Sequence, residues 1–144
     1  MKDLLRVENL TVEFGVHEGI LRAVDNVSFS IPPGGTLALV GESGSGKSVC
    51  SQAIMGLLPR TATIPSGSIL FEDPRIKQGS PIDIAKLDRA GPEMRTIRGG
   101  AISIIFQEPM TSLSALHTVG DQIGEAVELH GGGHFSEIDR KSVV

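Results

Sequence analysis

The sequence predicts an α/β fold in which an antiparallel layer of strands precedes a parallel sheet. In residues 5–14 and 27–31, apolar side chains alternate with polar ones, as in strands with one face on a core. Residues 36–40 and 101–106 are almost continuously apolar, as in strands covered on both faces of a parallel sheet. A glycine-rich loop and a helix-like segment directly follow the first of these two stretches, an order typical of an α/β unit.

The antiparallel layer is predicted to begin with a strand that has an irregularity at Asn9. Its alternating apolar residues are Leu5, Val7, Leu10, Val12 and Phe14. Gly15–Gly19 is predicted to be a turn. A second strand is predicted at Val27–Ile31, and the Pro-Pro-Gly-Gly run at 32–35 ends it. A further short strand is predicted at Ser68–Phe71.

The loop after residues 36–40 has the pattern G-x-x-x-x-G-K-[ST] of a phosphate-binding P-loop. Its residues are Gly41, Glu42, Ser43, Gly44, Ser45, Gly46, Lys47 and Ser48. A helix is predicted over Val49–Leu58, before Pro59. The glycines let backbone N–H groups point at phosphate oxygens, and the helix N-terminus adds partial positive charge. In this pattern Lys47 reaches the β- and γ-phosphates, and the Ser48 hydroxyl binds Mg²⁺.

Two simpler interpretations of this loop fit less well. A glycine-serine turn would explain the glycines, but not the strand before them, the helix after them and the Lys47-Ser48 pair together. A dinucleotide-binding loop of type G-x-G-x-x-G requires a third glycine where this sequence has Val49. The loop therefore predicts a site for a nucleoside triphosphate.

The second half of the sequence predicts less regular structure. Residues 72–92 are rich in charges, proline and glycine, which indicates an exposed connection with one helical turn near Ile84–Arg89. Thr118-x-x-Asp121 is a capping pattern. The helix that follows would place Val119, Ile123, Ala126 and Val127 on one face and end at Gly131–Gly133. Ser136-x-x-Asp139 is predicted to open another helix.

Composition limits the classes of protein and partner. The 144 residues, 40% of them hydrophobic, suit one globular domain. The net charge of −4 argues against a nucleic-acid partner. We find no apolar stretch of membrane-spanning length and no secretory signal, so we expect a cytoplasmic location. Cys50 is the single cysteine and is predicted to be a packed side chain.

The predicted nucleotide site lacks an acidic partner. A P-loop ATPase normally has a carboxylate at the end of a second buried strand, where it holds the Mg²⁺ shell. The second apolar segment here, Ile102–Phe106, is followed by Gln107, and Glu108 lies in a predicted loop before Pro109. A neutral amide is a poor substitute for a carboxylate near Mg²⁺.

Four segments of the sequence resemble the ATP-binding subunit of an ABC transporter, above all the importers of dipeptides, oligopeptides or nickel. They are residues 10–14, 41–48, 55–58 and 104–113. The resemblance runs from about Val7 to Ser142 and covers the N-terminal part of such a subunit. It implies a P-loop NTPase-type parallel core with an N-terminal antiparallel layer, truncated at the start of the helical subdomain. The antiparallel layer would be residues 1–35, the P-loop core part 36–106, and the Q-loop with the start of that subdomain 107–144.

The resemblance also implies roles for single residues. Gln107 would be the Q-loop glutamine, which contacts Mg²⁺ and the attacking water and acts with Lys47 in catalysis. Ser48 would be the other metal contact. Residues 41–49, which include Val49, would cradle ATP, and Phe14 would stack on adenine. Without the resemblance, Phe14 is equally well a core phenylalanine and Gln107 a polar residue that ends a strand.

Implied partners are transmembrane permease subunits, a second ATP-binding subunit and, indirectly, an extracytoplasmic solute-binding protein. The implied location is the cytoplasmic face of the membrane, as a peripheral subunit. ATP and Mg²⁺ are the implied cofactors. The implied activity is ATP hydrolysis that energises the import of peptides or a related small solute.

Several parts of the family pattern are absent from these 144 residues. There is no Leu-Ser-Gly-Gly-Gln signature, no apolar strand ending in Asp-Glu and no switch histidine after one. Ser114-Ala115 also replaces the Asn-Pro usual in the peptide subgroup. We therefore expect a truncated subunit that does not turn over ATP on its own.

Two alternatives remain open from the sequence. One is a fragment of a non-transport ABC ATPase of DNA repair or translation, although Met110–Leu113 after Gln107 favours a transporter. The other is a small P-loop kinase, which would need a basic site for the phosphate acceptor. Arg95 and Arg98 are a close basic pair that would suit it.

Overall fold

The computed structural model describes residues 3–73, 76, 80–106 and 113–131. The chain divides into two compact units, Met1–Ser103 and Ile104–Val144. The first unit contains a β-sheet and the helices α1 and α2, and the second contains the helix α3.

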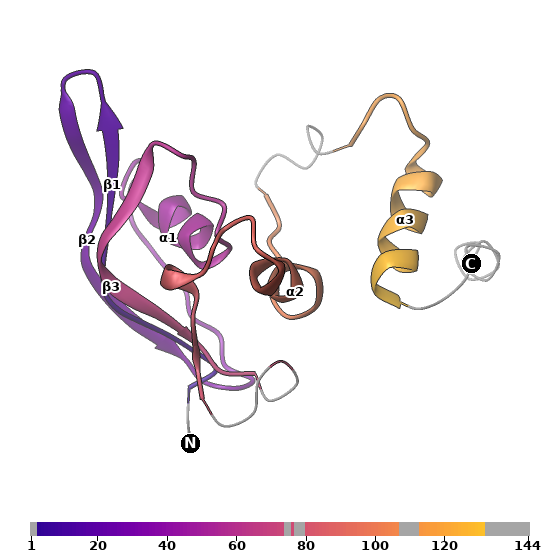
Figure 1. Cartoon of the computed structure of the whole chain (residues 1–144), viewed down its shortest axis with the longest axis horizontal. Coiled ribbons are helices and arrows are strands. Elements are labelled where there is room, and N and C mark those ends of the chain that lie inside the picture. Colours follow the sequence, from indigo (N-terminus) through magenta and orange to yellow (C-terminus); the bar gives the residue numbers. More distant parts are fainter. Residues whose placement is uncertain (1–2, 74–75, 77–79, 107–112, 132–144) are drawn as a thin grey trace. The chain divides into compact units, whose positions relative to one another are not determined.

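An antiparallel sheet forms the framework of the first unit (Figure 1). Its strands are β1 (Leu5–Val16), β2 (Gly19–Ile31), β3 (Ala62–Phe71) and β4 (Ile82–Asp83). The order is β2-β1-β3-β4, and every neighbouring pair is antiparallel. The predicted antiparallel layer is thus confirmed, and it also takes in strands from residues 62–83.

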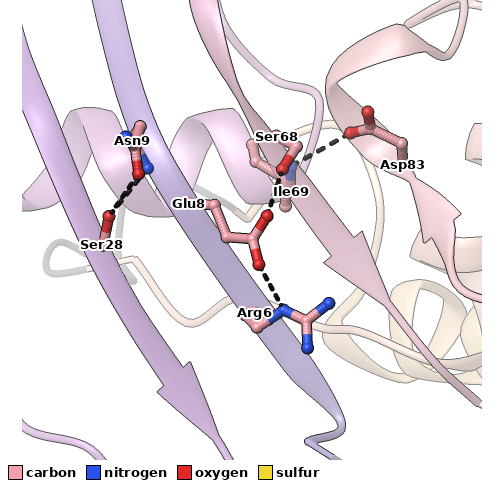
Figure 2. Close-up of polar contacts among 7 residues, drawn as sticks. All are labelled: Arg6, Glu8, Asn9, Ser28, Ser68, Ile69 and Asp83. Atoms are coloured by element: carbon pink, nitrogen blue, oxygen red, sulfur yellow. Dashed lines mark hydrogen bonds and ion pairs between the residues drawn. The ribbon is translucent and has the colours of Figure 1, made fainter.

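The irregularity predicted at Asn9 is a bulge in β1. Asn9 has φ 50°, and the pairing of β1 with β2 shifts between Val7 and Leu10. The Asn9 N–H donates to Ser28 Oγ at 2.8 Å, and the Ser28 hydroxyl donates to Asn9 Oδ1 at 3.2 Å (Figure 2). On β3, an ideal Cβ at Gly67 would lie 2.6 Å from the Asn9 carbonyl oxygen, so glycine is needed opposite the bulge. Val7 and Leu10 are three positions apart and would point to opposite faces of a regular strand. The bulge at Asn9 turns both side chains to the buried face.

Polar side chains make contacts within β1 and between neighbouring strands of the sheet (Figure 2). On β1, Arg6 Nε lies 2.7 Å from Glu8 Oε1. The Ser68 hydroxyl of β3 donates to Glu8 Oε2 at 3.3 Å, and the Ile69 N–H donates to Asp83 Oδ1 at 3.1 Å. The exposed Arg6–Glu8 ion pair lies within one strand and contributes about 0–1 kcal/mol. The hydrogen bonds from Ser68 and Ile69 link β3 to its neighbours on either side.

The core lies between the sheet and the helices of the first unit. Its largest fully buried side chains are Val7, Leu10, Val12, Ile69, Met94 and Ile97. Helix α1 (Lys47–Ile54) contributes Cys50 and Ala53 to the same cluster, and Figure 1 shows it beside the sheet. The aliphatic core is what a sequence with 3% aromatic residues requires.

Helix α1 begins and ends earlier than predicted. It starts at Lys47, and Gly56, with φ 61°, closes its C-terminus. The Gly56 N–H donates to the Ala53 carbonyl at 3.1 Å, and the Leu57 N–H donates to the Gln52 carbonyl at 2.8 Å. This pair of bonds is a Schellman motif. The helix therefore ends because of Gly56, before Pro59 is reached.

Helix α2 (Pro92–Gly100) was not predicted: Pro92 was assigned to an exposed connection, and no element was assigned to residues 93–100. It has proline at its start, Glu93 in the first turn and Arg98 in the last, all typical of a helix. Met94 and Ile97, three residues apart, are its buried residues. The helical turn predicted near Ile84–Arg89 is confirmed as the 3₁₀ turn η1 (Ile84–Lys86).

Two arginines hold the segment between α1 and β3 in place. The Arg89 guanidinium donates to the carbonyls of Leu58, Pro59 and Ala62 at 3.1–3.2 Å. Arg98 donates to the Arg89 carbonyl at 2.9 Å and to the Met55 and Gly56 carbonyls at longer range. Arg98 is therefore a structural cation, so it is not available as the phosphate-acceptor site that the kinase alternative would need.

The structure does not show the two predicted parallel strands. Residues 36–40 and 101–106 are described and contain no strand. Val40 is 93% exposed and Ile105 is 94% exposed, although both segments were expected to be buried. A strand needs hydrogen-bonded neighbours, and none of the strands of the described sheet pairs with either segment.

In the second unit, the predicted helix is α3 (Val119–Gly131). Its capping pattern is confirmed, since the Asp121 N–H donates to Thr118 Oγ1 at 3.1 Å and the Thr118 N–H donates to Asp121 Oδ2 at 3.3 Å. The Gln122 side chain contacts the loop before the helix: its Oε1 accepts from the Ser114 N–H, and its Nε2 donates to the Ser114 carbonyl. The helix predicted from Ser136 lies outside the described residues.

Candidate phosphate-binding site

The glycine-rich loop is attached to the sheet where α1 begins. Gly46, the N-cap of α1, has φ 87°. An ideal Cβ on Gly46 would lie 2.5 Å from the carbonyl oxygen of Ala23 and 3.4 Å from Val24 Cγ2, both on β2. Any other residue would combine a strained left-handed backbone with a clash against the strand. Gly46 therefore fixes the start of the helix against β2.

The loop backbone curls ahead of this attachment point. Gly44 has φ 82°, and the Ser45 N–H donates to the Glu42 carbonyl at 3.2 Å. The first hydrogen bond within α1 runs from the Cys50 N–H to the Gly46 carbonyl at 3.0 Å. The N–H groups before Cys50 in the first turn have no carbonyl of the helix to bond. With no acidic residue in that turn, the helix N-terminus suits an anion.

Lys47 places its charge inside the curl of the loop. Its Nζ donates to the Gly41 carbonyl at 2.7 Å, to the Glu42 carbonyl at 2.7 Å and to Ser45 Oγ at 3.0 Å. The two carbonyls lie at the start of the loop, and Lys47 is the first residue of α1. The ammonium thus joins the two ends of the loop.

The residues after Lys47 divide between the exposed and buried sides of α1. Ser48 is exposed, so its hydroxyl is accessible to a ligand. Val49 packs against the core, and Cys50 is buried. Burial raises the pKa of the Cys50 thiol, which keeps it neutral and unreactive near neutral pH. Cys50 is therefore a packed side chain, as predicted.

Phe14 lies on β1, between Leu21 of β2 and Ala62 of β3. It is partly buried and packs against the core. Val12, two residues earlier, pairs with Val24, the residue that approaches Gly46. Phe14 thus lies on β1, the neighbour of the strand β2 that Gly46 approaches. Its stacking on adenine stays a prediction.

Gln107 lies outside the described residues, so the predicted pairing of Ser48 and Gln107 around a metal ion stays a prediction. Within the part of the chain that the structure describes, no three His, Cys, Asp or Glu side chains cluster in a way that would hold a metal. Nor does any described helix have the length and apolarity to cross a bilayer.

The sequence did not indicate the contact between the Ser45 and Lys47 side chains. Ser45 was predicted only as one of the loop residues that surround phosphate. Its hydroxyl faces inward, and an ideal Cβ on Gly41 would lie 2.6 Å from it. The alternation of glycine and serine in the loop carries no signal of which hydroxyl turns inward.

The model of the ABC transporter family matches residues 24–142, which include the loop and all of α1, α2 and α3. The chain therefore belongs to the ABC transporter family.

Among curated proteins the chain is similar to ATP-binding proteins of importers. It is 49% identical over 131 residues to the dipeptide transport ATP-binding protein DppD of Bacillus subtilis, covering 90% of this chain and 36% of that protein. It is 44% identical to DppD of Lactococcus lactis, covering 90% and 34%. It is 43% identical to the glutathione import ATP-binding protein GsiA of Escherichia coli, covering 89% and 20%. The chain spans about a third of the length of the two DppD relatives.

Proposed function

We propose that this chain is the nucleotide-binding part of an ATPase that energises the import of peptides or a related small solute. The observation that carries the proposal is the Lys47 ammonium, which is held within the loop at 2.7 Å from two of its carbonyls. A triphosphate would place its β- and γ-phosphates against this charge and against the first turn of α1. The relatives are named as ATP-binding proteins of dipeptide transport and glutathione import, and these names support peptide import as the process that the ATPase would energise.

Magnesium would enter with the nucleotide. The exposed Ser48 hydroxyl is a single neutral oxygen ligand, and Mg²⁺ commonly takes most of its shell from phosphates and water. The donor set therefore fits a magnesium-nucleotide complex better than a free metal ion. Gln107 would supply the second contact. In a complete subunit, bound Mg²⁺ would neutralise charge that develops on the transferred phosphoryl group.

Hydrolysis and transport would require parts that these 144 residues do not contain. We propose that the active assembly includes a second ATP-binding subunit and transmembrane permease subunits at the cytoplasmic face of the membrane. In a chain as long as the relatives, residues 36–40 and 101–106 would become strands of a parallel sheet. Pairing would cover apolar side chains such as Val40 and Ile105, which are now exposed.

Titration of the wild-type chain with MgATP and with tripolyphosphate tests the proposed function. We expect both to bind, because both carry the triphosphate group that the positive charge of the loop would contact, and only MgATP carries a base. Calorimetry measures the two dissociation constants. If neither ligand bound, the assignment of a nucleotide site would be wrong.

The same titration tests the role of Phe14. If its ring stacks on adenine, Phe14→Ala should weaken MgATP binding about fivefold or more, since stacking of a base is worth about 1–3 kcal/mol. Tripolyphosphate, which has no base, should bind within about twofold of wild type. Phe29→Ala is the control, because Phe29 is also a partly buried aromatic residue packed on the core. Equal losses for both ligands in both variants would show that Phe14 is only a core residue.

A further inference from the structure

Lys47 makes three hydrogen bonds to the chain in the loop. An ammonium group has three donors and no acceptor. Two of these bonds go to the Gly41 and Glu42 carbonyls at 2.7 Å, and the third goes to Ser45 Oγ at 3.0 Å. A phosphate oxygen that bonds to Lys47 must therefore replace one of these partners or share a hydrogen with it.

The Ser45 hydroxyl is the partner that can be released most easily. It makes the longest of the three bonds, and it belongs to a side chain that turns about a single bond. The backbone of Ser45 is held separately, by its N–H bond to the Glu42 carbonyl at 3.2 Å. The carbonyls of Gly41 and Glu42 could leave Lys47 only if the loop backbone rearranged.

The inward position of the hydroxyl depends on the absence of a side chain at Gly41. An ideal Cβ there would lie 2.6 Å from Ser45 Oγ and 3.9 Å from Lys47 Nζ. The hydroxyl thus fills the space over the start of the loop, next to the ammonium. This is the space in which an anion would approach Lys47.

We propose that the Ser45 hydroxyl occupies the place of a phosphate oxygen in the ligand-free loop, and that phosphate displaces it from Lys47. Ser45 is then a positioning residue: it holds Lys47 in place before the ligand arrives, and it competes with the ligand. The two carbonyl bonds stay in place during the exchange and keep the ammonium oriented. This inference rests on the proposed function, because it assumes that the loop binds phosphate.

Substitution of Ser45 separates competition from direct contact with the ligand. Ser45→Ala removes the competing hydroxyl, so the dissociation constants of MgATP and tripolyphosphate should fall by about threefold to tenfold, which is the range for one hydrogen bond of ordinary net strength. In a Lys47→Ala background, Ser45→Ala should change neither constant. A hydroxyl that donates to phosphate would give weaker binding in both backgrounds, and that result, or unchanged affinity of the single variant, would overturn the proposal.

A second measurement needs no nucleotide. Side-chain NMR of ¹⁵N-labelled lysine reports how fast the hydrogens of each ammonium exchange with water. Exchange at Lys47 should be faster in Ser45→Ala than in wild type. Lys86, whose exposed Nζ lies 2.9 Å from Oδ2 of the largely buried Asp83 side chain, is the internal reference and should not change. Unchanged exchange at Lys47 would overturn the proposal, even if nucleotide binds. If Lys47 responds but no variant binds MgATP or tripolyphosphate, the proposed function and the exchange with phosphate both fail.

Discussion

Replacing Lys47 with alanine is expected to weaken binding of MgATP and of tripolyphosphate at least tenfold, which corresponds to about 1.4 kcal/mol. Lys47 supplies the positive charge inside the loop, and hydrogen bonds to charged groups are about twice as strong as neutral ones. The substitution also leaves the Gly41 and Glu42 carbonyls without the donor that holds them at 2.7 Å. The loop should therefore lose both its charge and part of its preformed shape.

Lys86→Ala is the matched control for this prediction. Lys86 belongs to the same unit and lies on η1, and its exposed ammonium pairs with Asp83 of β4. Calorimetry on both variants should show the loss only for Lys47→Ala, and circular dichroism should show that both remain folded. An unchanged dissociation constant for Lys47→Ala would remove Lys47 from the site.

The second large effect is expected at Gly46. Gly46→Ala should lower the free energy of unfolding by about 2–4 kcal/mol, since the left-handed backbone alone costs about 1–2 kcal/mol for a residue with a Cβ and a steric clash adds to it. The new Cβ would lie 2.5 Å from the Ala23 carbonyl oxygen, a backbone atom of β2. To relieve the contact, the start of α1 must move away from the sheet, so nucleotide binding should also be lost.

Gly44→Ala separates the two causes of this effect. Gly44 has a similar φ of 82°, but an ideal Cβ there would meet no atom within 4 Å. Its variant should lose only the part that comes from backbone strain, about 1–2 kcal/mol. Urea unfolding of the two variants measures the difference. If both lost the same free energy, the close contact between Gly46 and β2 would play no part in stability.

The features that the sequence predicted well are those decided by local chemistry. The curl of the loop follows from the positions of its glycines, two of which, Gly44 and Gly46, have positive φ. The bulge at Asn9 was visible as a break in the alternation, because an inserted residue shifts every later side chain to the other face. The cap of α3 depends only on Thr118 and Asp121, three residues apart.

The features that it predicted poorly depend on distant partners or on competing local signals. Residues 36–40 and 101–106 have the composition of buried strands, but pairing depends on neighbours that local pattern does not reveal. Helix α2 is short, and its Pro92 and the glycines at its end read equally well as a loop. The end of α1 was predicted at Leu58, before Pro59, but the left-handed Gly56 ends the helix earlier. The contact between Ser45 and Lys47 depends on a rotamer, which sequence does not specify.

The most direct test of the nucleotide site is a titration of the chain with MgATP, followed through its backbone amide resonances. Binding at the loop should shift the amides of residues 44–48 first and in a saturable way, because these N–H groups lie at the loop and at the N-terminus of α1. Saturable shifts confined to residues outside 41–49, or no shifts at millimolar MgATP, would contradict the assignment of this loop as the phosphate-binding site.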